Sequence, residues 1–258
     1  MKTNLIIGII ILIVIVLCLT GCKDSGVSEN LVYNKTTNKT TNKTNTQTSS
    51  VDYEVAAKKQ MAAPEKGETV AIITVKNFGD IKVKFFNDIA PKAVENFVTH
   101  SKNGYYNGTT FHRVMEEFMI QGGDPEGTGS GGESIWGKVF GEELDLGLVP
   151  SRGALCMASR GTGTSSIGSQ FFIVQANYDE EMASALKQYN YPDGLIEQYK
   201  KYGGYMSLYQ GYTVFGQVFE GMDVVDKIVS VEKGISVSGE LSVPIEKIVV
   251  EKISIVEY

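Results

Sequence analysis

The residue types best suited to chemistry gather in two short segments of this 258-residue chain. The segment FHRVMEEFMIQGGD at 111–124 holds Arg113 and, eight residues later, Gln121, and the segment GSQFFIV at 168–174 adds aromatic side chains. A guanidinium and an amide supply planar donors, and aromatic rings supply apolar walls. This combination suits electrostatic stabilisation in a site poor in water, and it contains no evident nucleophile.

The sequence argues against several other kinds of site. The two histidines, His100 and His112, lie on different expected elements without a neighbouring cysteine pair, so we expect no metal site. The run at 127–132 satisfies GxGxxG, but no helical pattern follows it, and a loop is the better interpretation. The net charge of −6 argues against a nucleic-acid partner. Cys156, the one cysteine in the body of the chain, is expected to be a small buried residue.

The elements that must position these residues are mostly short strands. Apolar and alternating runs predict a hairpin from strands at 69–75 and 81–85. Helical spacing predicts a helix at 90–98, with Pro91 near its start, and another at 222–229. The other expected strands lie at 109–115, 118–122, 153–158, 171–175, 212–219 and 245–256. Many short strands with few helices predict a mainly β fold, a closed antiparallel barrel with helices at its ends.

Six motifs, in order along the chain, resemble the signature of the cyclophilins. They are FHR at 111–113, FMIQGGD at 118–124, GALCMA at 153–158, GSQFF at 168–172, YTVFG at 212–216 and EGMDVV at 220–225. The resemblance runs from about Val70 to the end of the sequence. It implies a closed eight-stranded antiparallel barrel capped by two helices, forming one domain at 67–258 that needs no cofactor. It also implies the activity of that family, peptidyl-prolyl cis-trans isomerisation.

Prolyl isomerisation explains why a nucleophile is unnecessary. Rotation about a peptide bond meets a barrier of ~18–20 kcal/mol, because the nitrogen shares its lone pair with the carbonyl. A catalyst has to favour the twisted state, in which the pyramidal nitrogen can accept a hydrogen bond, and a fixed cation suits that task. The resemblance implies that Arg113 binds the carbonyl of the proline and approaches its nitrogen. It implies that Gln121 orients Arg113 and contacts the substrate.

Nine further positions match substrate-binding residues of the family. The resemblance implies an apolar slot for the proline ring, formed by Phe118, Met119, Phe172 and Leu208. It implies that the backbone of Ala158 and Ser159 pairs with the substrate. The remaining walls would be formed by Gly129, Gln170 and Tyr212. Tyr212 stands where many members have a histidine, and because an aromatic donor is kept we expect activity to survive. Ser207 stands where a tryptophan often precedes the pocket leucine.

The stretch near 178–205 is longer than the usual connection in the family. Its helical texture and six tyrosines in and beside it predict a packed helical insertion beside the pocket. Such an insertion could stabilise the domain or bind a partner, and we favour the role in stability.

The N-terminus has the pattern of a targeting segment. Residues 1–21 carry Lys2 and then an apolar run that suits a signal peptide better than a comfortable membrane span. The sequence Leu-Thr-Gly-Cys ending at Cys22 resembles the lipobox of bacterial lipoproteins, which implies cleavage before Cys22 and lipidation of that residue. An uncleaved signal anchor is the alternative. Residues 22–66 include the polar repeat NKTTNKTTNKTN and are expected to form a disordered tether.

These features together predict an enzyme on the extracytoplasmic face of the cell membrane. Its expected partners are proline-containing unfolded or exported polypeptides and, through Cys22, the membrane itself. We expect a monomer. A non-catalytic module that binds proline segments, or a holdase chaperone, remains the alternative, because binding and catalysis would use the same pocket. A third interpretation makes the barrel a scaffold for an assembly factor that acts through the insertion.

Overall fold

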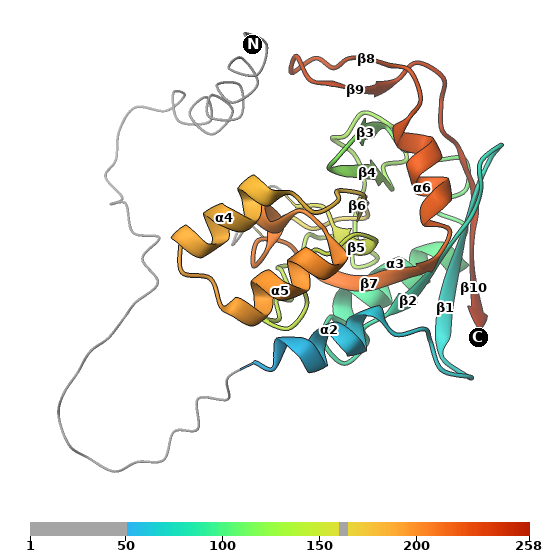
Figure 1. Ribbon diagram of the computed structural model, residues 1–258. Coiled ribbons are helices and arrows are strands. Elements are labelled where there is room, and N and C mark those ends of the chain that lie inside the picture. The colour runs from blue at the N-terminus through green and yellow to red at the C-terminus, as the bar shows by residue number, and fades with distance from the viewer. Residues whose placement is uncertain (1–50, 160–164) are drawn as a thin grey trace, which may run out of the picture. The chain divides into compact units, whose positions relative to one another are not determined.

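The computed structural model describes residues 51–159 and 165–258, and its main feature is a curled eight-stranded antiparallel sheet (Figure 1). The strand order is β10-β1-β2-β7-β5-β6-β4-β3. The strands are β1 (Thr69–Val75), β2 (Gly79–Phe85), β3 (Arg113–Met115), β4 (Met119–Gly122), β5 (Ala154–Met157), β6 (Phe171–Val174), β7 (Val214–Glu220) and β10 (Val250–Glu257). The mainly β fold expected from the sequence is confirmed.

The β1–β2 hairpin shows how the sequence pattern produces the sheet. Ile73 of β1 and Ile81 of β2 are paired across the hairpin, and both are fully buried. Alternate side chains of a strand point to opposite faces, so the intervening residues lie on the other face. In the connecting turn Asn77 has a φ of 68°, a left-handed conformation that asparagine tolerates better than most residues.

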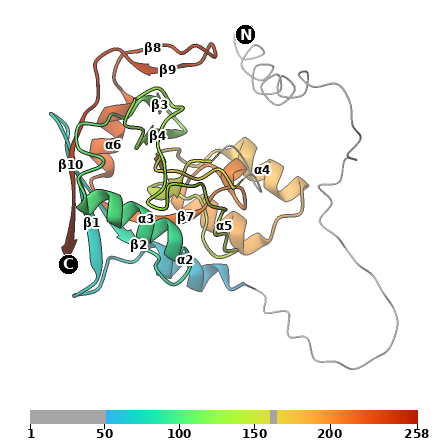
Figure 2. The ribbon, with the colours of Figure 1, turned by 180° about the vertical axis from the view of Figure 1, so that it is seen from behind.

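Two helices cap the sheet, as the sequence predicts. Helix α3 (Pro91–Lys102) begins at the expected proline, and helix α6 (Met222–Val229) has the expected bounds. Figure 2 shows α3 lying across the sheet near β7. Phe97 of α3 sits edge-on to Phe171 of β6, with ring centroids 5.2 Å apart, so the helix shares an aromatic core with the strands that carry the site.

The barrel is not fully closed, and the expectation of a closed barrel overstated it. Strands β3 and β10 lie at the two ends of the strand order and are not paired with each other. An isolated bridge between Thr110 and Val249, with a hydrogen bond of 2.9 Å from the Phe111 N–H to the Ile248 carbonyl, spans the gap just before β3 begins. β3 has only three residues, which is too short to form a continuous ladder with β10.

The predicted helical insertion is present and has a core of its own. It contains α4 (Glu180–Gln188), α5 (Asp193–Tyr202) and the 3₁₀ helix η2 (Met206–Leu208). Leu186, Leu195, Ile196 and Tyr199 are buried together in it. This packing supports the preferred interpretation of the insertion as a stabilising element.

A small hairpin that the sequence pattern did not predict follows α6. Strands β8 (Lys233–Ile235) and β9 (Leu241–Pro244) pair only with each other in the described parts of the chain. We call residues 233–244 the arm. In both views of the ribbon the arm lies on the same side of the molecule as β3 and β4, and β9 packs beside β3 (Figures 1 and 2).

Part of the predicted tether is also structured. Residues 53–61 form helix α2 (Tyr53–Met61), so the expectation of a disordered segment up to residue 66 is wrong here. Asp52 caps the start of the helix, and Gln60, which is fully buried although glutamine is polar, ties it to the domain. Its Nε2 donates to the Val149 carbonyl at 2.7 Å and to Gln217 Oε1 at 3.1 Å, and its Oε1 accepts from the Val149 N–H at 3.1 Å. The folded unit therefore begins before residue 67.

We predict that Gln60→Ala destabilises the domain by about 2–4 kcal/mol, because it leaves both backbone groups of Val149 buried without this partner. Urea unfolding followed by circular dichroism would measure the change. Lys58→Ala on the same helix is the control. Lys58 is exposed, and within the described ranges its ammonium forms an ion pair only with Glu54, so its removal should change the free energy of unfolding by less than about 0.5 kcal/mol. Equal effects of the two substitutions would contradict the prediction.

Candidate active site

The β3–β4 hairpin brings the two most chemically distinctive side chains together. Arg113 and Gln121 are directly opposed in the antiparallel register, so their side chains emerge on the same face of the sheet. The turn between the strands contains Glu117, whose φ is 53°. Its carboxylate accepts hydrogen bonds from the backbone and side-chain nitrogens of Asn177 at 3.0 and 2.8 Å. The hairpin is thereby docked against the segment that follows β6.

The guanidinium of Arg113 has partners on several sides. Its Nη1 donates to Gln121 Oε1 at 3.3 Å, and its Nε and Nη2 donate to the two carboxylate oxygens of Glu240 at 2.6 and 2.7 Å. Its Nη2 also lies 3.3 Å from the sulfur of Met115, and its central carbon is 5.4 Å from the centre of the Phe118 ring. The hydrogen bond from Arg113 lowers the pKa of Glu240 below its ordinary value, so the Glu240 carboxylate is ionised at neutral pH.

The apolar residues assigned to the proline slot lie in one cluster. Met119, Phe172 and Leu208 are buried in it, and Phe118 packs against it while remaining partly exposed. The Tyr212 ring stands edge-on to Phe172, with centroids 5.6 Å apart. The structure therefore brings together five residues from four separate segments of the sequence.

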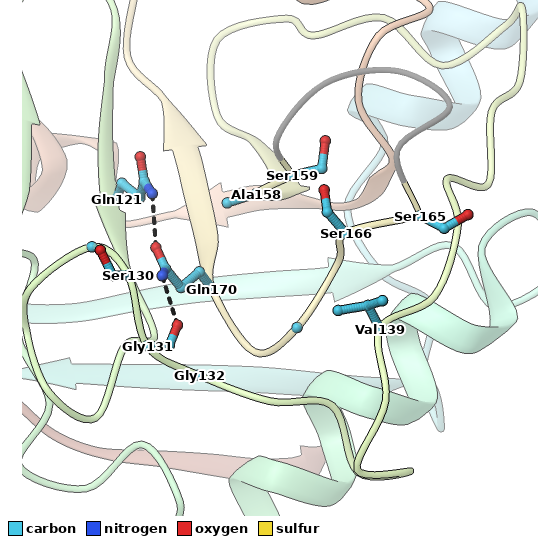
Figure 3. Close-up of a pocket in the computed structure, with 12 residues that line it drawn as sticks. Gln121, Ser130, Gly131, Gly132, Val139, Ala158, Ser159, Ser165, Ser166 and Gln170 are labelled. Atoms are coloured by element: carbon cyan, nitrogen blue, oxygen red, sulfur yellow. Dashed lines mark hydrogen bonds between the residues drawn. The ribbon is translucent and has the colours of Figure 1, made fainter.

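A polar groove of about 330 Å³ adjoins this cluster (Figure 3). Gln121 Nε2 donates to Gln170 Oε1 at 2.9 Å, and Gln170 Nε2 donates to the Gly131 carbonyl at 2.8 Å. Ala158 belongs to both the groove and the apolar cluster, which joins the two parts into one site. The assigned residues that line the groove are Gln121, Gly129, Ala158, Ser159 and Gln170.

A buried carboxylate holds the glycine-rich wall of the groove. Asp124 is fully buried, and its oxygens accept hydrogen bonds from the backbone N–H groups of Glu126, Thr128, Gly129 and Gly131. Burial alone would raise the pKa of Asp124, but these donors and the Thr128 hydroxyl lower it below its ordinary value. The GxGxxG run is thus a loop wrapped around a carboxylate, and no helix follows it.

Three neighbours of the site were not identified from the sequence. The Tyr205 ring packs against the Phe118 ring at a tilt of 43°, with centroids 4.4 Å apart, although the position of Tyr205 in the insertion gave no sign of that contact. Asp124 is the last residue of the motif that contains Gln121. The glycine-rich run that follows it could have indicated a loop held by the Asp124 carboxylate. Glu240 is 127 residues from Arg113 in sequence, and nothing in the sequence links the two.

The arrangement offers binding and polarisation rather than covalent chemistry. Burial raises the pKa of the Cys156 thiol, and the side chain is buried as the sequence predicted, so it is not a nucleophile. Within residues 51–159 and 165–258, no group of three or more His, Cys, Asp or Glu side chains is placed to hold a metal ion. Fixed donors beside an apolar slot can bind a carbonyl next to a small apolar ring.

Comparison with solved structures assigns this curled sheet to the cyclophilin fold class. A cyclophilin-type peptidyl-prolyl cis-trans isomerase from Cryptosporidium parvum matches with a TM-score of 0.59 and 32% sequence identity, over 74% of this chain and 99% of its own. A second structure of that protein, determined in the presence of the dipeptide Ala-Pro, matches with a TM-score of 0.58 and the same identity, over 73% of this chain and 99% of its own.

Sequence relatives give the same result. The family model described as cyclophilin type peptidyl-prolyl cis-trans isomerase/CLD matches residues 69–255. A Staphylococcus saprophyticus protein, provisionally named a peptidyl-prolyl cis-trans isomerase, is 45% identical over 199 residues, which are 77% of this chain and 98% of its own. A Staphylococcus aureus protein with the same provisional name is 44% identical over 194 residues, which are 75% of this chain and 94% of its own. The chain belongs to the cyclophilin-type peptidyl-prolyl cis-trans isomerases.

We predict that Asp124→Asn lowers the free energy of unfolding by about 2 kcal/mol at pH 7, because an amide cannot accept all the N–H bonds that the carboxylate accepts. The folded-state pKa of Asp124 is depressed, so its contribution is present above the unfolded pKa and is lost as pH falls through the folded pKa. The difference in free energy of unfolding between wild type and Asp124→Asn, measured by urea titration, should therefore become smaller toward pH 3. The control Glu126→Gln changes an exposed side chain and should unfold with the same free energy as wild type. A difference between wild type and Asp124→Asn that does not change with pH would contradict this account.

Proposed function

We propose that this isomerase accelerates X-Pro rotation through Arg113 and Gln121, and that its clients are exported polypeptides at the outer surface of the cell membrane. The observation that carries the first part is the opposed Arg113–Gln121 pair beside the apolar cluster. The second part rests on the targeting pattern that ends at Cys22, which lies outside the described residues.

The proline ring would enter the apolar cluster formed by Phe118, Met119, Phe172 and Leu208. With the ring bound there, the carbonyl of the proline and the prolyl nitrogen would lie near the guanidinium of Arg113. As the bond twists, the nitrogen loses conjugation and its lone pair becomes a hydrogen-bond acceptor. A donor that is already fixed stabilises this state more than the planar ground state, which is the requirement for catalysis.

The polar groove would take the residues on the other side of the proline. Its lining is rich in amides, hydroxyls and backbone groups, and the Gln121–Gln170–Gly131 chain of hydrogen bonds keeps its wall in place. Such a surface binds polypeptide backbone with little selectivity among side chains. That property suits a catalyst that acts on many proline-containing segments. We propose that the protein works as a monomer, since the whole site is built from one chain.

We predict that Arg113→Ala lowers the isomerisation rate by about 10²- to 10³-fold, the effect of removing a fixed electrostatic donor from a site of this kind. NMR exchange spectroscopy on an Ala-Ala-Pro-Phe peptide would measure both the exchange rate and the peptide affinity. Arg152→Lys is the control, because it keeps a cation beside Asp226 and lies outside the site. It should leave the rate unchanged.

The same measurement separates catalysis from simple binding. Wild-type protein that binds the peptide without accelerating exchange would indicate the proline-binding module or holdase instead. An undiminished rate in Arg113→Ala would show that this residue does not carry the reaction.

The membrane location would come from lipid on Cys22. No helix in the described ranges is both long enough and apolar enough to cross a bilayer. We propose that the segment before Cys22 is cleaved and that acyl chains on Cys22 hold the protein at the membrane. Several chains on one residue anchor stably, whereas one chain binds only marginally.

We predict that Cys22→Ser moves the protein from the membrane fraction to the soluble fraction when it is expressed in a bacterium. Mass spectrometry of the N-terminal peptide should find lipid on Cys22 in the wild type. Cys18→Ser is the matched control, because the proposed cleavage removes residue 18, and this variant should stay in the membrane fraction. Retention of Cys22→Ser on the membrane would favour an uncleaved anchor.

A further inference from the structure

The arm meets the guanidinium of Arg113 through the carboxylate of Glu240. Glu240 follows the tip of the arm, where the Ser236 N–H donates to the Glu240 carbonyl at 2.7 Å and the Glu240 N–H donates to the Ser236 hydroxyl at 3.1 Å. Gly239, with a φ of 86°, completes this tight turn. The Ser242 hydroxyl on β9 also bonds the Glu240 carboxylate. The backbone and side chain of Glu240 are therefore both held before it meets Arg113.

The base of the arm is fixed as well. The ammonium group of Lys233 donates to the carbonyls of Val229 and Val231, just after α6, and the Ile245 N–H donates to the Glu232 carbonyl at 3.0 Å. Because the arm is held at its base and in its turn, it can fix the position of a side chain that it contacts, such as Arg113. A freely moving loop could not do so.

The hydrogen bonds of Arg113 show what this position achieves. A guanidinium has five N–H groups. Glu240 accepts from two of them, on Nε and Nη2, while Gln121 and the sulfur of Met115 each face one more. Among the described residues, this leaves one N–H of Nη1 without a protein partner. That N–H shares its nitrogen with the one that faces Gln121, the other residue assigned to catalysis.

Glu240 supplies the strongest of these contacts. Its two bonds of 2.6 and 2.7 Å are bidentate and join opposite charges, whereas the Gln121 bond is 3.3 Å long and thioether sulfur is a weak acceptor. Arg113 is one-third exposed and would otherwise keep much of its side-chain freedom. The carboxylate grips one edge of the guanidinium, and the Phe118 ring covers a face. Together they fix the plane.

We propose that Glu240 is the positioning residue of the active site, which holds the guanidinium of Arg113 in the orientation that presents the remaining Nη1 N–H to the twisting prolyl bond. This inference rests on the proposed role of Arg113 in catalysis. Glu240 itself does not touch the substrate. It acts through Arg113, by making the donor rigid before the substrate arrives, and the arm exists in this chain to deliver it.

Two other roles for the same pair lead to different outcomes. If the pair only fastens the arm to the sheet, its loss would lower stability and leave the chemistry intact. If Glu240 instead blocks the site by occupying the donors of Arg113, its loss would speed the reaction. Positioning predicts a slower reaction with little change in affinity, because the apolar slot and the groove still hold the peptide.

The test uses the full chain carrying Glu240→Ala, Glu240→Gln or Glu240→Asp, with the Ala-Ala-Pro-Phe peptide as the probe. NMR exchange measurements give the Kd and the exchange rate on the enzyme separately. We expect Glu240→Ala to slow the exchange about 10-fold while Kd changes by less than about 2-fold. Glu240→Gln matches the native shape and should also slow the exchange, because the amide oxygen can replace only one carboxylate oxygen and the NH2 group then faces a second N–H donor of Arg113. Glu240→Asp keeps the charge and should recover part of the rate.

A spectroscopic signal reports the positioning directly. The Nε–H resonance of Arg113 should be sharp and protected in the wild type and should broaden or vanish in Glu240→Ala. Glu232→Gln is the control, since it removes the same charge from an exposed position at the base of the arm and should alter neither the resonance nor the rate. Loss of the resonance with an unchanged or faster exchange rate would overturn the proposal. An Arg113→Ala variant with full activity would overturn the proposed function as well, so the two failures are distinguishable.

Discussion

One cation held in a fixed orientation beside an apolar slot is the constraint on which the rest of this structure depends. Arg113 has to be charged, partly desolvated and immobile at once, and a long flexible side chain does not meet these conditions alone. Its partners come from its own hairpin, through Gln121 and Phe118, and from the far end of the chain, through Glu240. The sheet is the frame that holds these segments at the required separation.

The packing around the site serves the same end. Strand β6 supplies Phe172 to the slot, and directly after it Gln175 and Asn177 secure the hairpin turn at Glu117. On the opposite wall, the buried Asp124 carboxylate accepts hydrogen bonds from the backbone of the glycine-rich loop and holds it in place. Both walls are thus tied by hydrogen bonds to buried or partly buried groups, so the slot and the groove are preformed. A preformed site loses less entropy on binding than one that must be ordered by its ligand.

Local patterns explain which features could be predicted from the sequence. The helices beginning at Pro91 and Met222 follow from apolar spacing and from proline at a helix start, and the short strands follow from alternation. The neighbours in the slot were expected because they belong to motifs that resemble a known family. Helix α2 has local signals, an N-cap at Asp52 and the Glu54–Lys58 pair, but it follows a polar repeat and was taken as part of the tether. The contacts of its buried Gln60 lie far along the chain, at Val149 and Gln217, and no local pattern shows them. The contact of Glu240 with Arg113 was missed for the same reason, since no local pattern encodes a pairing across the whole domain.

The pairing of β1 with β10 has a consequence for how this protein acquires its shape. β1 lies between β2, its immediate neighbour in sequence, and β10, which joins it in a register that matches Thr69 with Glu257. Contacts between such distant residues raise the contact order, and folding slows as contact order rises. During synthesis, β1 has one edge unpaired until β10 has been made. We therefore expect this prolyl isomerase to fold slowly itself and to be open to mispairing along that edge until its last strand is in place.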